Sequence, residues 1–231
     1  MATGQYAVPS DPQGRAVVPG VPVTPPGPVP SPVPPVGAGF ADPAPLGLAG
    51  FAGTTFFLSV VNTNMLGASV QTIVLGLALF YGGLAQLLAG MWEFAKGNTF
   101  GAVAFSSFGA FWLSFWYLLN HLPEKAAAGD VLNGVGLYLL VWTIFTAYMT
   151  VGAMRVSAAV LAVFVFLTLT FLVLTIGWLT ESVSDFEANS NVWIHLGGWL
   201  GIITALLAWY ASFAAVTNAT FRRVVLPTLP R

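Results

Sequence analysis

The chain contains no cysteine and very little charge. Without cysteine it has no disulfide, no thiolate metal site and no cysteine nucleophile. Only 6% of its 231 residues are charged and the net charge is −1, whereas soluble domains carry about a quarter charged residues. No basic surface exists to attract nucleic acid. Because 57% of the residues are hydrophobic, the composition predicts an integral membrane protein.

The first 41 residues lack the basic and then apolar pattern of a cleaved signal peptide. They include the proline-rich tract VPGVPVTPPGPVPSPVPPVGAG. Such a tract has no period that could bury a face, and it favours polyproline II or disorder. We expect residues 1–41 to form a disordered cytoplasmic tail, with a PxxP partner segment as the alternative.

Six apolar runs of about twenty residues follow, each long enough to cross a hydrocarbon core of about 30 Å. Short polar breaks separate them. We therefore predict an all-α membrane domain of six transmembrane helices over 42–220, followed by a short basic tail at 221–231. The predicted spans are 45–64, 70–95, 98–120, 133–153, 156–180 and 192–216.

Lysine and arginine predict the orientation. With the N-terminus inside, Lys125 is the only basic residue in an outer loop. The inner basic residues are Arg15, Lys96, Arg155, Arg222, Arg223 and Arg231. Because basic residues concentrate on the cytoplasmic side, both termini are predicted to be cytoplasmic, and the inner or plasma membrane is the expected location.

Polar and small residues interrupt the second and third spans at selected depths. In hydrocarbon each polar group must face protein, water or substrate, because an unpaired one costs several kcal/mol. Gly97-Asn98-Thr99 predicts a turn and a helix cap. Glu93 lies three residues before Lys96, and an interfacial ion pair between the two is the plainest interpretation. The candidate polar stations are Thr55, Tyr81, Gln86, Glu93, Asn98 and Thr168.

The start of the first span carries residues that favour the beginning of a helix. Asp42 can accept hydrogen bonds from the free N–H groups of the first helical turn, and Pro43 suits the first helical position. No charged residue or histidine lies near the middle of a predicted span. A protein-borne proton relay is therefore not expected. Enzymatic activity is not expected either, because the sequence has no HExxH motif, no pair of intramembrane aspartates and no Ser/His pairing. No metal site or cofactor is predicted.

Two segments resemble a known family of membrane proteins. One is DPAPLGL, and the other is the block YGG, AQ, GMWE, KGNTFG and SSFG over residues 81–109. Together they are similar to the acetate uptake transporter family, of the succinate–acetate permease type, and the resemblance runs from residue 42 to the C-terminus. The residues of the first motif are Asp42, Pro43, Ala44, Pro45, Leu46, Gly47 and Leu48.

This resemblance implies a permease for acetate and related small carboxylates, proton-linked or channel-like, built as a homohexamer with one path per subunit. It places a central constriction on Phe51, Phe108 and Leu167, with Ala208 as a neighbour that affects selectivity. It also implies a role in transport for Glu93, because the matching acid of the family affects transport. The chain departs from the family at Asp42, where asparagine is usual, and at Phe108, where tyrosine is common. A pore for a neutral solute such as urea, ammonia or an amide is the alternative.

Overall fold

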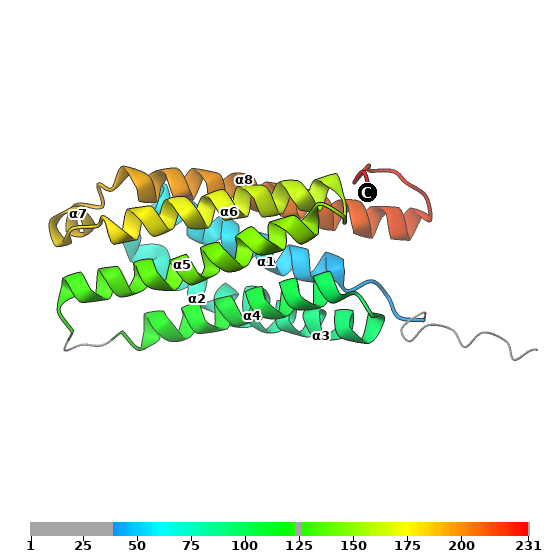
Figure 1. Cartoon of the computed structure of the whole chain (residues 1–231), viewed down its shortest axis with the longest axis horizontal. Coiled ribbons are helices and arrows are strands. Elements are labelled where there is room, and N and C mark those ends of the chain that lie inside the picture. The colour runs from blue at the N-terminus through cyan, green and yellow to red at the C-terminus, as the bar shows by residue number, and fades with distance from the viewer. Residues whose placement is uncertain (1–38, 123–125, 231) are drawn as a thin grey trace, which may run out of the picture. The chain divides into compact units, whose positions relative to one another are not determined.

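The structure is a computed structural model that describes residues 39–122 and 126–230, and within them the fold is all-helical (Figure 1). Six helical segments are long and apolar enough to cross a membrane, as predicted. The proline-rich tail, Arg15, Lys125 and Arg231 lie outside the described residues. The spans are α1 Ala44–Asn62, a composite segment Ser69–Lys96, α4 Thr99–Asn120, α5 Ala128–Ala153, α6 Ala158–Leu179 and α8 Val192–Phe221.

Two helices, α5 and α8, are longer than predicted, and a third helix was not predicted. Helix α5 begins five residues earlier than expected, and α8 continues five residues beyond residue 216. The predicted polar break before α8 contains a short helix, α7 Val183–Ala188, whose N-cap is Ser182. These differences arise at polar ends, where hydropathy is a weak guide to where a helix stops.

The second span changes its helical pitch along its length. It starts as η1 Ala68–Ile73, a 3₁₀ helix, and passes through the single turn α2 Val74–Gly76. A nine-residue π-helix, η2 Leu77–Ala85, follows and leads into α3 Gln86–Lys96. π-helical turns are rare and occur frequently at functional sites. This one contains the YGG sequence and ends at the residue before Gln86.

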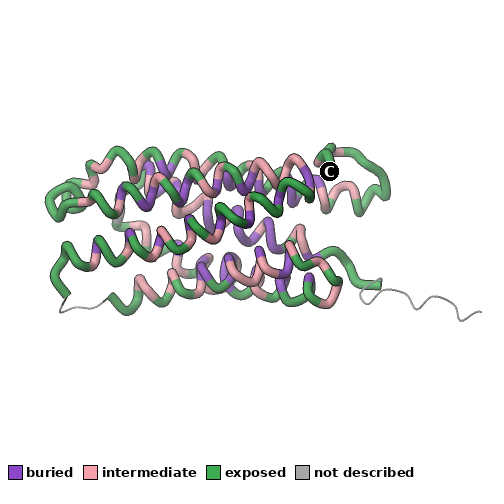
Figure 2. Tube along the Cα trace, viewed as in Figure 1, coloured by how far each residue is buried: buried purple, intermediate pink, exposed green. Residues whose placement is uncertain are grey.

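Helix α1 lies at the centre of the bundle (Figure 1). It packs against α8 on one side and against η2 and α3 on the other, while α6 packs between α5 and α8 and α3 packs on α4. Figure 2 shows the buried positions on the sides of the helices that face one another, with exposed positions on the outer sides and at both ends. The exposed side chains along the spans are mainly large and apolar, as lipid-facing surfaces require.

The two ends of the bundle differ in charge. The end that holds the start of α1, the α3–α4 turn, the α5–α6 turn and the end of α8 is called the Lys96 end here, and it carries the four basic residues described by the structure, Lys96, Arg155, Arg222 and Arg223. Among the described residues, the opposite end, called the Glu181 end, carries Asp130 in the first turn of α5 and the acids of the α6–α8 connection, Glu181, Asp185 and Glu187.

The segment after α8 folds back along the bundle. The Asn218 side-chain oxygen accepts hydrogen bonds from the backbone N–H groups of Val225 at 2.7 Å and Leu226 at 3.0 Å. The backbone N–H of Ala158 then donates to the carbonyl of Leu229 at 2.9 Å. Residues 222–230 therefore cover the start of α6 at the Lys96 end.

Candidate substrate path

Three cavities follow one another from the Glu181 end toward the middle of the bundle. The entrance cavity has a volume of about 360 Å³ and is apolar, with walls from α4, α5 and α7. The central cavity, about 70 Å³, shares Gln71, Phe115 and Trp178 with the entrance cavity. The small cavity, about 20 Å³, lies beyond it. The central and the small cavity both exceed the roughly 10–15 Å³ that a cavity needs to hold a water molecule.

The three residues that the family resemblance assigned to a constriction lie where the central and small cavities meet. Phe51 and Leu167 line both cavities, and Phe108 lines the small one. Each is only 3–4% exposed. The ring centroids of Phe51 and Phe108 are 5.7 Å apart, and Phe108 also contacts Phe145 at 5.3 Å. The geometry therefore brings these side chains together as an apolar closure between two cavities.

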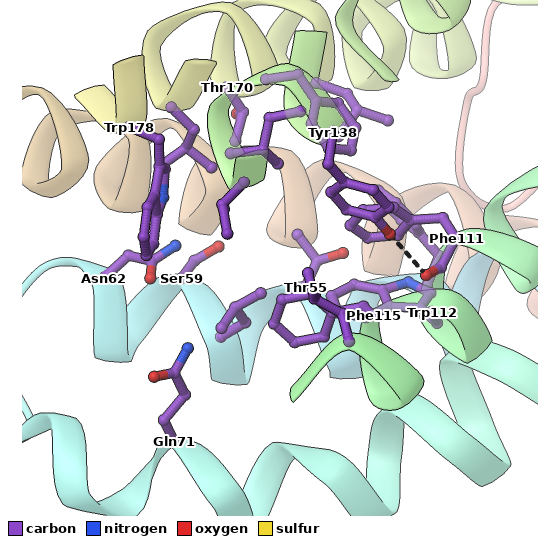
Figure 3. A pocket seen from close by; sticks show the side chains of 18 residues that line it. Thr55, Ser59, Asn62, Gln71, Phe111, Trp112, Phe115, Tyr138, Thr170 and Trp178 are labelled. Atoms are coloured by element: carbon purple, nitrogen blue, oxygen red, sulfur yellow. Dashed lines mark hydrogen bonds between the residues drawn. The ribbon is translucent and has the colours of Figure 1, made fainter. Parts of the chain in front are cut away.

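The central cavity has a polar side and an aromatic side (Figure 3). Thr55, Ser59 and Asn62 project from α1 and Gln71 from η1, facing aromatic side chains of the other helices. The rings opposite belong to Phe111, Trp112, Phe115, Tyr138 and Trp178.

Two buried hydrogen-bond donors in this cavity have no partner. The Thr55 hydroxyl and the Trp112 indole N–H have none among the described residues, and the two side chains are 6% and 2% exposed. Thr55 follows Phe51 by four residues and Trp112 follows Phe108 by four. Because four residues make about one helical turn, the two donors lie one turn from the apolar closure, on its Glu181 side. Buried donors without partners indicate a place for water or for a ligand oxygen.

Gln86 lies on the other side of the closure. It lines the small cavity together with Phe51, Phe108 and Leu167, it is 1% exposed, and its side-chain oxygen has no partner among the described residues. The prediction that Gln86 is a polar group inside the bundle is therefore supported by its position. The small cavity is otherwise apolar, since its remaining lining side chains carry no polar atom.

The π-helix positions Gln86 by bringing η2 against α1. A Cβ on Gly50 would lie 2.5 Å from the carbonyl oxygen of Tyr81, and one on Gly82 would lie 2.5 Å from the hydroxyl oxygen of Thr54. Only glycine permits backbones to approach this closely in a membrane bundle. The Thr54 hydroxyl donates to the carbonyl of Gly50 at 2.9 Å. Gln86, directly after the π-helix, is buried and lines the small cavity.

Lys96 pairs with Asp42 rather than with Glu93. Its Nζ lies 2.8 Å from Asp42 Oδ1, and the same oxygen accepts the backbone N–H of Ala44 at 3.1 Å. The predicted interaction of Asp42 with the first turn of α1 is thus present. The expected Glu93–Lys96 ion pair is absent, because Glu93 turns toward α4, where Gly101 leaves space for its carboxyl group, while Lys96 reaches outward to the start of α1.

The remaining predicted site residues have other surroundings. Asn98 caps α4 by accepting the N–H of Gly101 at 3.2 Å, after a turn in which Gly97 has a φ of +79°, as the sequence predicted. Tyr81 packs against α1. Ala208 is fully buried in the core. None of these three lines a described cavity.

Thr168 is engaged in helix packing. Its hydroxyl donates to the carbonyl of Phe164 at 2.8 Å and lies 2.8 Å from the Thr150 hydroxyl on α5. Its hydrogen-bonding capacity is therefore used between helices. Thr170, two residues further along α6, is also paired, with the Thr204 hydroxyl on α8 at 3.2 Å, and it lines the central cavity as well.

Sequence reasoning missed Trp112 and underestimated Ser106. A tryptophan in a membrane span is usually read as part of an interfacial belt, and only the fold reveals that this indole N–H is buried and unpartnered. From the sequence alone, two alternatives are open for Ser106, a bond back to the backbone one turn earlier or a position facing a pore. Its hydroxyl is buried against Gly90 without a partner among the described residues.

Comparison with known proteins identifies the family. The model of the GPR1/FUN34/yaaH family matches residues 27–231. The chain belongs to this family. It is accordingly a multi-pass membrane protein with six candidate spans, and the resemblance noted in the sequence is confirmed.

Several relatives carry functional names. The chain is 44% identical over 186 residues to the ammonia transport outward protein 2 of Saccharomyces cerevisiae, covering 78% of this chain and 62% of that protein. It is 41% identical over 197 residues to acetate permease A of Emericella nidulans, covering 81% and 65%. The succinate-acetate/proton symporter SatP of Escherichia coli K12 is 39% identical over 189 residues, covering 81% and 94%. The chain therefore spans about two thirds of the fungal relatives and most of the bacterial one.

A solved structure of the bacterial acetate channel SatP has the same fold. It superimposes with a TM-score of 0.71 at 38% sequence identity, and the match covers 82% of this chain and 99% of that one. The names of the bacterial relatives describe two modes of transport, a proton symporter and a channel.

Proposed function

We propose that this protein is a membrane permease for acetate and related small carboxylates. The observation that carries the proposal is the row of cavities that narrows to the apolar closure, with the unpartnered donors of Thr55 and Trp112 one turn before it. Family membership and relatives named for acetate transport support the substrate class. The family and this site support a transporter rather than an enzyme.

The central cavity suits a small monocarboxylate. The hydroxyl of Thr55 and the indole N–H of Trp112 would each donate to a carboxylate oxygen, since both are buried and free. The methyl group of acetate would then face the rings of Phe51 and Phe108. An apolar closure offers nothing to replace the hydration shell of an inorganic ion, so it favours a solute that is itself partly apolar.

The distribution of charge supports an orientation. Because the basic residues described by the structure all lie at the Lys96 end, the positive-inside rule places that end in the cytoplasm, with both termini on that side. The entrance cavity would then open outward. The proposed location is the plasma membrane, and the proposed assembly is the homohexamer implied by the family resemblance, with exposed apolar side chains facing lipid and neighbouring subunits.

Uptake of labelled acetate into proteoliposomes tests this function. The purified protein is expected to give saturable uptake above that of protein-free vesicles, which correct for acetic acid that crosses lipid unaided. Thr55→Val keeps the shape of the side chain and removes its hydroxyl, so unlabelled acetate should compete less well with labelled acetate for uptake. The control is Thr220→Val, whose hydroxyl bonds, among the described residues, only to the carbonyl of Val216 and lies outside the cavities described; competition should be unchanged. Absence of saturable acetate flux would overturn the proposal.

A second candidate is a pore for ammonia, favoured by the 44% identity to the ammonia transport outward protein. A narrow apolar closure also suits a small neutral molecule. The same vesicles distinguish the two functions, because an ammonia pore would pass ammonia or methylamine without competition from acetate. If ammonia passes and acetate neither passes nor competes, the second function replaces the first.

A further inference from the structure

Glu93 is a fully buried carboxyl group inside a membrane-spanning segment. The residue is 0% exposed, and neither of its carboxyl oxygens has a hydrogen-bond partner among the described residues. Burying an ionised carboxylate without a partner is very costly. Ionisable groups held in this way inside membrane proteins mark ion or proton pathways. The cavities described above do not reach Glu93, so the proposed substrate path leaves this group unused.

The charged groups near Glu93 are already engaged with each other. Lys96 on α3 and Asp42 at the start of α1 form their own ion pair at 2.8 Å. Helices α1 and α4, which pack against α3, contain no charged residue. The Asn98 amide lies beside the carboxyl group, since a Cβ built on Gly101 would be 2.7 Å from Asn98 Nδ2 and 2.8 Å from Glu93 Cδ. Glu93 therefore has a neutral polar neighbour and no ion-pair partner of its own among the described residues.

Two further unpartnered groups connect Glu93 with the small cavity. Gln86, Gly90 and Glu93 occupy one buried face of α3, and the Ser106 hydroxyl of α4 lies against Gly90, 2.3 Å from where a Cβ there would be. Gln86 Oε1, Ser106 Oγ and the Glu93 carboxyl group thus follow one another along the seam between α3 and α4. Along α3 the steps are one helical turn, about 5.4 Å, a separation that one bridging water spans with two hydrogen bonds.

From these positions we propose that Glu93 binds the proton that accompanies the carboxylate, and that this proton moves along the α3–α4 seam by way of Ser106, separately from the carboxylate itself. The proton leaves the acid at the small cavity next to Gln86, binds a Glu93 oxygen, and is released to water at the Lys96 end, three residues away at the end of α3. No covalent bond other than O–H forms or breaks. Glu93 thereby acts as the proton acceptor of a symport step.

This inference depends on the proposed carboxylate transport, and the experiment separates the two. Proteoliposomes with an internal pH-sensitive dye are clamped in membrane potential with potassium and valinomycin. Acetate-driven proton entry and exchange of labelled for unlabelled acetate are measured in parallel, with protein-free vesicles subtracted. Glu93→Gln keeps the size of the side chain and cannot carry a proton. Its proton entry should fall about a hundredfold, the low end of what a positioned proton-transfer group contributes, while exchange persists.

Two further variants complete the test. Glu187→Gln alters an exposed carboxyl on α7 at the opposite end and should leave both fluxes unchanged. Ser106→Ala removes a hydroxyl that has no partner among the described residues, so folding should tolerate it. It should lower proton entry and leave acetate exchange unchanged. If Glu93→Gln fails to fold, Ser106→Ala is the variant that tests the proton path. Unchanged proton entry in the Glu93 or Ser106 variants overturns the inference. Exchange without proton entry in the unmodified protein overturns it too but leaves the permease intact, whereas absence of any acetate flux overturns the permease.

Discussion

Two sets of helix interfaces differ in whether their buried polar side chains are hydrogen-bonded. Between α5, α6 and α8 the threonine hydroxyls are paired across the helices, Thr143 with Thr175 at 3.0 Å and Thr170 with Thr204 at 3.2 Å. Between α3 and α4 the side-chain oxygens are buried too, yet Gln86, Ser106 and Glu93 each have an oxygen without a partner among the described residues. Interhelical hydrogen bonds are a recurrent means of holding membrane helices together. This explains the buried threonines between α5, α6 and α8, but it does not explain the unpartnered groups between α3 and α4.

The difference indicates which polar residues have a structural role and which are available for transport. A paired threonine has used its capacity and is worth about 0.6 kcal/mol per bond in a membrane bundle. An unpaired buried group instead costs about 1–3 kcal/mol, so it lowers stability unless a water or a solute satisfies it. We infer that the α5–α6–α8 threonines hold the bundle together and that the α3–α4 groups interact with what moves through it.

The largest effect on uptake of the carboxylate itself is expected from Gln86→Leu. This change removes a polar group at the small cavity and leaves the volume nearly unchanged. The Gln86 amide N–H would donate to the carboxylate, and losing one hydrogen bond to a charged solute costs about 1.5–3 kcal/mol. Acetate uptake should therefore fall by about tenfold or more. The melting temperature in detergent should be unchanged or slightly higher, because no hydrogen bond among the described residues is lost. Normal uptake by this variant would remove Gln86 from the path.

Thr143→Val is expected to lower stability and to leave transport unchanged, the reverse of Gln86→Leu. The change breaks the bond to Thr175 and the bond from Thr143 to the carbonyl of Leu139 at 2.9 Å. The free energy of unfolding should fall by about 1 kcal/mol, with acetate uptake per folded molecule unaffected. A double-mutant cycle with Thr175→Val isolates the shared bond. A coupling energy near zero, or a loss of transport, would contradict the structural role.

The sequence predicted the parts of the fold that depend on local pattern. Six apolar runs gave six spans, because a membrane helix must satisfy its own backbone and be about twenty residues long. The turn at Gly97 and the cap at Asn98 were also predictable, since a left-handed glycine and a capping asparagine act on adjacent residues. The motif residues Phe51 and Phe108 were placed at a closure by resemblance alone; their spacing in the sequence carries no such information.

The features that the sequence did not predict depend on tertiary contacts or on small differences in helical pitch. A run such as LALFYGGLA is apolar on every side, so hydropathy cannot distinguish a π-helix from an α-helix over nine residues. The partner of Lys96 is Asp42, 54 residues earlier, whereas sequence reasoning looked three residues back to Glu93. The complete burial of Glu93 follows from the packing of α4 at Gly101, which no local pattern reveals.

A smaller effect is expected from Asp42→Asn, which breaks an ion pair where the α3–α4 seam reaches the surface. Lys96 and Asp42 are 34% and 46% exposed, so the pair is screened and worth about 0.2–1 kcal/mol. Asparagine still accepts the N–H of Ala44, because it caps helices as well as aspartate does. The loss of unfolding free energy should therefore be small at low salt and vanish at high salt. A loss that persists in high salt would mean that the pair is more than a surface contact.

The smallest effect concerns Glu181, a carboxyl group that, unlike Glu93, has a partner. It lies in the connection after α6 and accepts a hydrogen bond from the Asn191 side chain. Burial raises the pKa of Glu181 above its ordinary value of 4.5, and the bond from Asn191 offsets part of this rise. Because the folded pKa is the higher one, the folded state binds the proton more tightly. This contribution to stability is complete below about pH 4.5 and is lost as the pH rises through the raised pKa.

Glu181→Gln imitates the protonated form and should remove that loss. The variant's melting temperature in detergent should match the unmodified protein at about pH 4 and exceed it slightly at about pH 8. A variant that is less stable at the higher pH would mean that the charged carboxylate is held favourably by Asn191 and that burial is the lesser influence. Glu181 would then be a carboxylate stabilised by its partner Asn191, whereas Glu93 has no such partner among the described residues. The contrast between paired and unpaired polar groups would therefore hold for carboxyl groups as well as for hydroxyls.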